Sequence, residues 1–152
     1  MDQQSEPRSF ENVINEIRTA FDSVPYPSRL VRGTTADYDD VTTAFRGIRW
    51  QEVPARTIEQ NRNGLPFFSP EGLHYYLPAF MVYGLQNLQN SDVVFNTIIG
   101  LKPSEQMRLT SRRFSKAQSD AVKSFLEALA ALDDGDIDER AKDALDELTN
   151  YF

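Results

Sequence analysis

Residues 69–88 read SPEGLHYYLPAFMVYGLQNL, and this stretch decides the fold class. It opens with a capping serine, a proline suited to the first helical position and an acid suited to the first turn. The following residues are apolar nearly all round, which is typical of a helix buried on most sides. Because proline lacks a backbone donor and clashes with the preceding turn, Pro78 predicts a kink that divides this helix into pieces at 70–77 and 78–88.

Further helices are predicted on both sides of this stretch from apolar residues that recur every three or four positions. Ser9 is a candidate N-cap for a helix over residues 9–24, and Ser115 with Gln118 matches a capping box that opens a long helix. Asp136 with Glu139 is predicted to cap the last one. Shorter helices are predicted at these ranges: 38–46, 54–62 and 103–110.

One segment leaves two structures open. Ser91 is a candidate cap for a short helix that carries Val94, Ile98 and Leu101. Strand is the competing prediction, because the runs VVF and TII are rich in β-branched and aromatic residues.

The sequence as a whole predicts a mainly α protein. We expect an irregular single-domain bundle of about six to eight helices, several of them short, around a central apolar helix kinked at Pro78. The domain is expected to span residues 9–152, after a flexible amino terminus at 1–8. A chain of 152 residues with 40% hydrophobic residues has enough material for one core.

Composition excludes several kinds of chemistry. The chain has no cysteine and one histidine, so thiolate metal sites, a cysteine nucleophile and two-histidine metal sites are excluded. No glycine-rich phosphate loop is present. We therefore expect no cofactor and no metal, and we favour binding over catalysis. No secretory signal and no apolar stretch of about 20 residues is visible, so we expect a cytoplasmic protein without a membrane partner.

The net charge of −7 is concentrated at the carboxyl end. Residues 133–152 hold eight acids and two bases, which gives −6 and leaves −1 for the other 132 residues. Four of these acids share the predicted last helix and form a candidate site for a protein partner: Glu139, Asp143, Asp146 and Glu147. The leading hypothesis is a small protein-binding module, and its most specific form is an immunity protein or inhibitor that covers a basic partner.

Residues 102–116 carry the opposite charge, with five bases and one acid. This basic segment is expected to contact the protein's own acidic end. Because +4 is a modest charge for a phosphate backbone, we do not expect a nucleic-acid partner.

Two other functions remain open. Glu71, His74, Tyr75 and Tyr76 could line a pocket for a small ligand or an enzymatic reaction, although aromatic residues at helical spacing more often form core. The protein could also be a structural subunit of a larger assembly, which a wide exposed apolar patch would indicate. The oligomeric state stays open.

Three segments carry a resemblance to a known family: VPYPSRLV, FRGIRWQEV and FFSPEGLHYYLPAFMVYGL. Together they resemble a family of small bacterial proteins of unknown function that share a motif like SPEGLHYYLPAF. The resemblance implies a bacterial or phage cytoplasmic origin. It implies no activity, because the family has no established function and no site residues to transfer.

Overall fold

The helix that follows Ser69 lies at the centre of the fold. In the computed structural model, which describes residues 9–152, it is α4 (Pro70–Gln86), and thirteen of its seventeen residues are buried. The described chain has two short 3₁₀ helices, at Trp50–Glu52 and Leu65–Phe67, and seven other α-helices: α1 (Phe10–Phe21), α2 (Ala36–Phe45), α3 (Ala55–Gln60), α5 (Val93–Leu101), α6 (Glu105–Ser111), α7 (Lys116–Ala130) and α8 (Ile137–Leu148). The prediction of a mainly α, single-domain bundle is confirmed. The expected flexible terminus at 1–8 lies outside the described residues.

The prediction that Pro78 divides the central helix is wrong, because α4 runs through this residue without interruption. A proline inside a helix removes the hydrogen bond to the carbonyl of His74, four residues earlier. The side chains before and after Pro78 are buried against neighbouring helices, so tertiary packing offsets the lost bond. The low helix propensity of one proline therefore affects the course of this helix less than the burial of the whole segment does.

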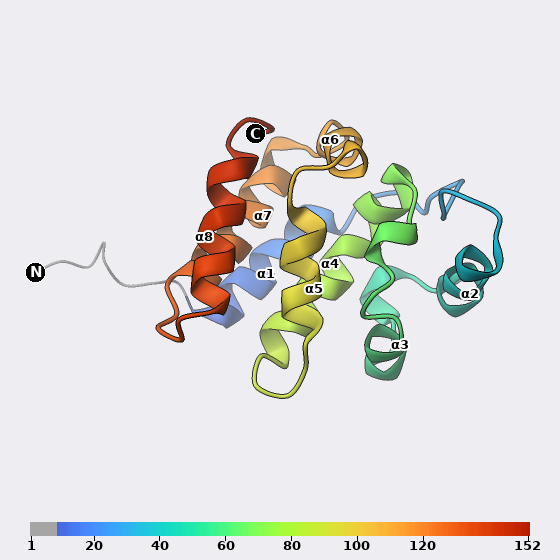
Figure 1. Cartoon of the computed structure of the whole chain (residues 1–152). Coiled ribbons are helices and arrows are strands. Elements are labelled where there is room, and N and C mark those ends of the chain that lie inside the picture. Colours follow the sequence, from blue (N-terminus) through green and yellow to red (C-terminus); the bar gives the residue numbers. More distant parts are fainter. Residues whose placement is uncertain (1–8) are drawn as a thin grey trace, which may run out of the picture.

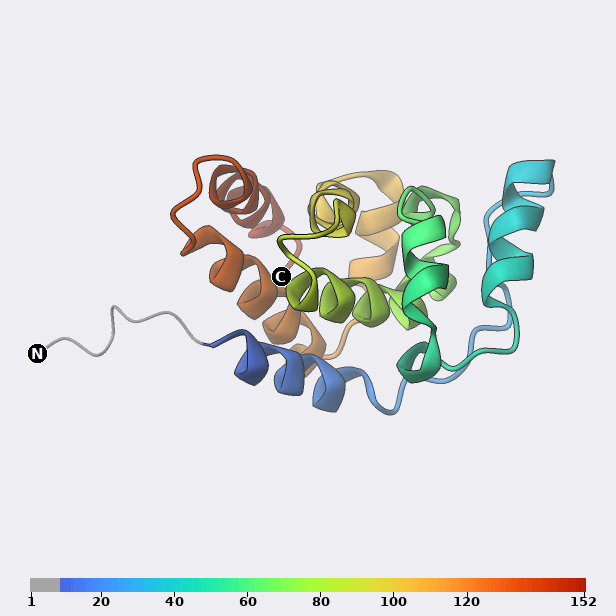
Figure 2. The same cartoon turned by 90° about the horizontal axis from the view of Figure 1, so that it is seen from below.

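The helices form layers on either side of α4 (Figure 1). Figure 2 shows α1 on one side of α4 and α5 on the other. At one end of the bundle α7 packs against both α1 and α8, and α8 also contacts α5. The helix α2 lies at the opposite end, so the acidic α8 and the segment around α2 are far apart (Figure 1).

Local sequence signals account for most helix starts. The Ser9 hydroxyl accepts the backbone N–H of Asn12 at 3.2 Å, and Ser115 with Gln118 forms a complete capping box. The segment that the sequence left open between helix and strand is the helix α5, and the Ser91 hydroxyl accepts the N–H of Val93 at its start.

The start of α4 holds the loop at residues 26–32 in place. The Ser69 hydroxyl donates to the carbonyl of Arg29 at 2.6 Å, and the Ser69 N–H donates to the carbonyl of Leu30 at 2.9 Å. One oxygen of the Glu71 carboxylate accepts the N–H of Ser28 at 2.8 Å. Val31 and Phe68 form an isolated antiparallel bridge beside these contacts. Two of the segments that carry the family resemblance are thus bound directly to each other.

Candidate functional site

The acidic residues predicted as a binding site lie together on the outer face of α8. The inner face of this helix is apolar and buried against α7 and α5: Ile137, Ala141, Ala144 and Leu148. The 3.6-residue period of a helix therefore directs the four predicted acids outward, and all four are exposed: Glu139, Asp143, Asp146 and Glu147.

The turn before α8 fixes where this acidic face begins. Gly135 has a φ of 82°, a left-handed conformation that glycine adopts without strain. One oxygen of Asp134 then accepts the backbone N–H groups of Asp136 and Ile137, each at 2.8 Å. These bonds, the first of them above all, lower the pKa of Asp134.

Asp136 is the N-cap residue of α8, as predicted, but its side chain makes no capping bond, because its carboxylate pairs with Arg140 at 2.9 Å and Asp134 accepts the N–H groups at the start of the helix. Both residues are acids in the same turn, so residue type alone could not separate them. The left-handed Gly135 decides between them, since it turns the chain back toward Asp134.

Three of the four acids have no ion-pair partner among residues 9–152: Glu139, Asp143 and Asp146. Glu147 contacts Lys102 at 3.6 Å, and both side chains are nearly half exposed. This contact confirms for one pair the expectation that the basic segment reaches the acidic end. Arg108 of the same segment pairs instead with Glu105, one turn away on α6.

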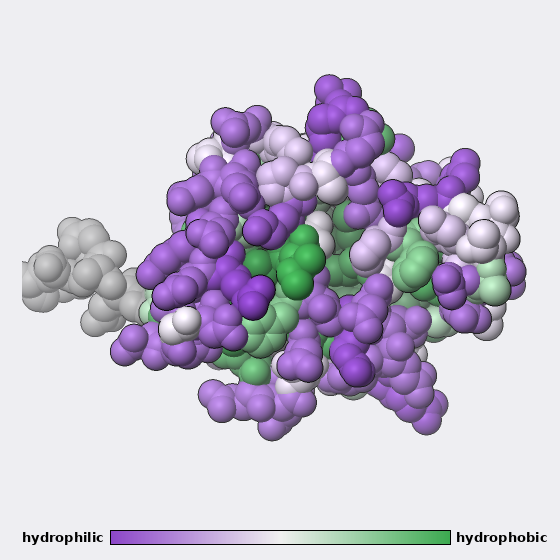
Figure 3. Space-filling model, in the orientation of Figure 1, coloured by the Kyte–Doolittle hydropathy of each residue, from purple (hydrophilic) through white to green (hydrophobic). Residues whose placement is uncertain are grey.

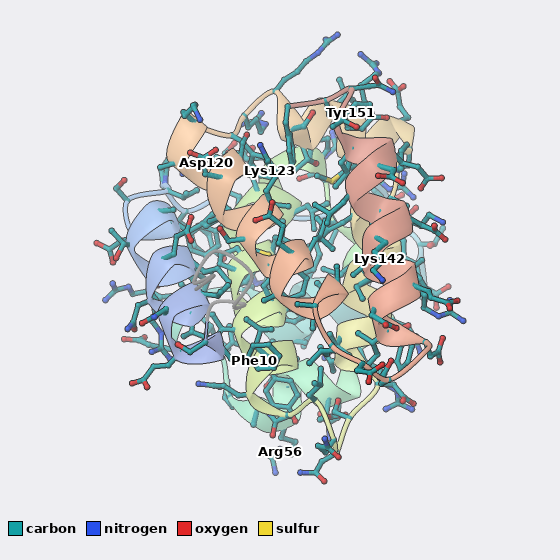
Figure 4. The ribbon with its side chains drawn as sticks, turned by 90° about the vertical axis from the view of Figure 1, so that its left-hand side faces the viewer. Phe10, Arg56, Asp120, Lys123, Lys142 and Tyr151 are labelled. Atoms are coloured by element: carbon teal, nitrogen blue, oxygen red, sulfur yellow. The ribbon has the colours of Figure 1, made fainter. Side chains whose placement is uncertain are left out.

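Cations border the acidic row on both sides. Arg140 lies on the α5 side, held by Asp136 and placed 5.4 Å from the centre of the Phe95 ring. On the other side Figure 4 shows Lys142 on α8 and Lys123 on the neighbouring α7. Between these borders the outward face of α8 presents acids only.

Three residues of the predicted pocket, His74, Tyr75 and Tyr76, are buried and hydrogen-bonded within the core, and Glu71 is half-buried. His74 is 9% exposed, and its Nε2 lies 2.8 Å from Oε1 of Gln118, whose amide donates to the carbonyl of Ala20. The rings of Phe21 and Phe114 pack against the imidazole. Burial lowers the pKa of His74, and the bond to Gln118 opposes that shift only in part. The neutral imidazole is therefore favoured.

The tyrosines and the acid of the same prediction are occupied as well. The Tyr75 hydroxyl accepts the N–H of Trp50 at 3.2 Å, and the Tyr76 hydroxyl lies 2.8 Å and 2.5 Å from the carbonyls of Phe45 and Ile48. Glu71 accepts the backbone N–H groups of Ser28 and Arg29 in the loop. The tyrosine bonds join the segments FRGIRW and SPEGLHYY, and the bonds of Glu71 join α4 to the loop, so these contacts hold the fold together.

Sequence reasoning missed an exposed apolar edge beside the acidic row. Ile99 of α5 is 54% exposed, and it borders a hollow of about 420 Å³ that Leu65, Pro66, Gly100 and Pro103 also line. Figure 3 shows hydrophobic atoms over α5 next to the hydrophilic surface over α8. The run TII predicted only an apolar segment, because which of its residues stays uncovered depends on where α8 packs.

Two other features are absent from the described part of the chain, a cluster of metal ligands and a membrane-spanning helix. Within residues 9–152, acids and the histidine form no cluster of three that could hold a metal ion. No helix in the same range has both the length and the apolar character to cross a membrane.

The fold and this surface define a small all-helical, single-domain protein whose exposed features are an acidic helix face and an apolar edge. The chain belongs to DUF6714, a family of unknown function, whose profile matches residues 9–152. The comparison with curated proteins and the comparison with solved structures gave no significant match.

Proposed function

We propose that this protein is a binding module that covers a basic protein partner with the outer face of α8. The observation that supports the proposal is the row of four outward acids on α8, three of which have no ion-pair partner among residues 9–152. Glu139, Asp143 and Glu147 follow one another at spacings of four, and such like-charge neighbours repel by roughly 0.2–0.5 kcal/mol per pair in an isolated helix. Cationic groups of a partner would relieve this repulsion, because each would lie close to two carboxylates.

The specific form of the proposal is an immunity protein or inhibitor in a bacterial cytoplasm. Such a protein acts by covering its partner, so it needs a charged surface of the opposite sign and no catalytic group. The lack of cysteine and the family resemblance support this setting. An acidic face also steers a basic partner toward it, which raises the association rate at low salt.

Net charge alone also favours solubility, so the test must separate the position of the acids from their number. The test variant is Glu139→Lys/Asp143→Lys/Asp146→Lys, which leaves Glu147 and its pair with Lys102 intact. The matched control reverses three exposed acids elsewhere and changes the net charge equally: Asp22→Lys/Asp40→Lys/Glu127→Lys. Each protein is immobilised and exposed to a lysate of its native host at low and at high salt.

We expect the wild type and the control to retain the same basic protein at low salt, and the test variant to lose it. Mass spectrometry identifies the retained protein, and high salt should release it, because exposed charges are screened beyond about 10 Å at 0.1 M salt. The proposal would be overturned if all three proteins retained the same partners equally. It would also be overturned if the wild type retained no protein that the test variant loses.

A further inference from the structure

Ile99 is exposed although its side chain is strongly apolar. Among residues 9–152 it and Tyr26 are the two large hydrophobic residues that remain exposed. Tyr26 has a visible role, since its hydroxyl accepts the N–H of Gly47 at 2.8 Å and its ring packs on Tyr75. Ile99 has no such polar contact. Covering it would remove apolar surface from water, which stabilises a complex in proportion to the area buried.

Two contacts between α5 and α8 place Ile99 beside the acidic row. Arg140 lies over Phe95, and Glu147 pairs with Lys102. Phe95 lies on α5 and Lys102 directly follows this helix, seven positions after Phe95; Arg140 and Glu147 are also seven positions apart, on α8. The two helices therefore run parallel in register along this edge.

The same register determines which residues of α5 and α8 lie beside each other halfway between these two contacts. Ile99 lies between Phe95 and Lys102 on α5, and Asp143 lies between Arg140 and Glu147 on α8. An exposed apolar side chain is thus level with an exposed acid that has no ion-pair partner among the described residues.

The hollow on the other side of Ile99 extends the apolar surface. Its wall is held by Gln106, whose amide donates to the carbonyls of Leu65 and Phe68 at 2.9 and 2.8 Å. Gly100 lies directly against Leu65, which keeps this wall close to α5. The volume of about 420 Å³ is enough for one or two apolar side chains. Arg62 and Lys102 also line the hollow, so the cations of any bound segment are favoured on the opposite side, over α8.

The charge of the acidic row indicates which kind of molecule could cover Ile99. A second copy of the chain, packed on Ile99 by a two-fold axis that crosses α5 and α8, would bring the acidic row of one copy near that of the other. Like charges placed together in this way oppose association. A segment that is cationic along one side and apolar along the adjacent side matches both halves of the surface.

We infer that the partner is recognised through a basic amphipathic helix, whose cations lie along Asp143 and its acidic neighbours and whose apolar side chains cover Ile99 and enter the hollow. This inference rests on the proposed function and adds the chemistry of the recognised segment. The apolar contact supplies affinity that resists salt, and the acidic row supplies attraction that salt screens.

The experiment uses two synthetic peptides of identical composition as probes. In the first, lysines follow one edge of a helix and leucines follow the adjacent edge; in the second, the same residues are arranged so that the leucines share no face. Binding of each peptide to the full chain is measured by calorimetry at low and at high salt. The protein variants are Ile99→Ser, Ile99→Leu as the conservative control, and the triple reversal of the acidic row. Both changes at Ile99 are at an exposed position, so we expect the fold to tolerate them.

The wild type should bind the amphipathic peptide about tenfold more tightly than the scrambled one, as expected from covering one aliphatic side chain. Ile99→Ser should abolish this difference and Ile99→Leu should keep it, while the triple reversal should weaken both peptides. Equal binding of the two peptides would overturn this inference and leave the proposed basic partner standing. Failure of the wild type to bind either peptide at low salt would contradict the proposed function itself. Dimerisation of the wild type that Ile99→Ser abolishes would assign the edge to a second copy and overturn the inference.

Discussion

The carbonyl oxygen of Leu30 occupies the space into which a side chain at Gly72 would extend. A Cβ atom there would overlap backbone atoms of Leu30, and backbone held by other hydrogen bonds cannot move aside cheaply. The third helical residue of α4 must therefore be glycine for the loop at residues 26–32 to dock.

We expect Gly72→Ala to lower the free energy of unfolding by about 3 kcal/mol, near the upper end of the usual cost of overpacking. Gly100→Ala is the matched control in another helix. There the new Cβ would meet the end of the flexible Leu65 side chain, and the higher helix propensity of alanine offsets that contact. Urea unfolding measures both changes. A cost for Gly72→Ala no larger than that for Gly100→Ala would show that the loop yields and is not clamped.

The helix starts that a serine caps were predictable because their signals are local. A capping serine and the backbone group it binds are three residues apart, as Ser9, Ser69 and Ser115 all show. The course of α4 through Pro78 was not predictable in this way, because the burial that offsets the proline comes from helices distant in sequence.

The candidate site was predicted in part for the same reason. The outward row on α8 follows from apolar spacing within one helix, which the sequence displays directly. The exposure of Ile99 depends on how two helices meet, and the bond between His74 and Gln118 joins residues 44 positions apart. Neither relationship has a local sequence signal, so only the structure could reveal them.

The turn before α8 gives a second prediction, because Asp134 and Asp136 make different contacts. Asp134→Ala removes the acceptor of two backbone N–H groups and should lower Tm by several degrees. Asp136→Ala removes only an exposed pair with Arg140 and should change Tm less. Thermal unfolding followed by circular dichroism compares the two variants. The reverse order of the two shifts would show that Asp136 caps the helix after all.

The neutral, buried His74 gives a third prediction, for the dependence of stability on pH. Burial lowers the pKa of His74 below its ordinary value of 6.5, so the unfolded chain takes up a proton at a higher pH than the folded chain does. Stability from this group is complete above pH 6.5 and is lost as the pH falls below that value, with a slope of at most about 1.4 kcal/mol per pH unit. Glu71 and Asp134 are carboxyl groups whose pKa values are lowered by folding. They therefore change the stability of the protein only below about pH 4.5.

The interval from pH 7 to pH 5 consequently reports His74, the only histidine of the chain. Urea unfolding at closely spaced pH values should show a steady loss of stability for the wild type across this interval. His74→Gln cannot titrate, so its stability should be lower at pH 7 but nearly constant down to pH 5. Parallel profiles for the two proteins would mean that the folded state binds the proton as readily as the unfolded chain. The imidazole would then have to be accessible to water, contrary to its packing between Phe21 and Phe114.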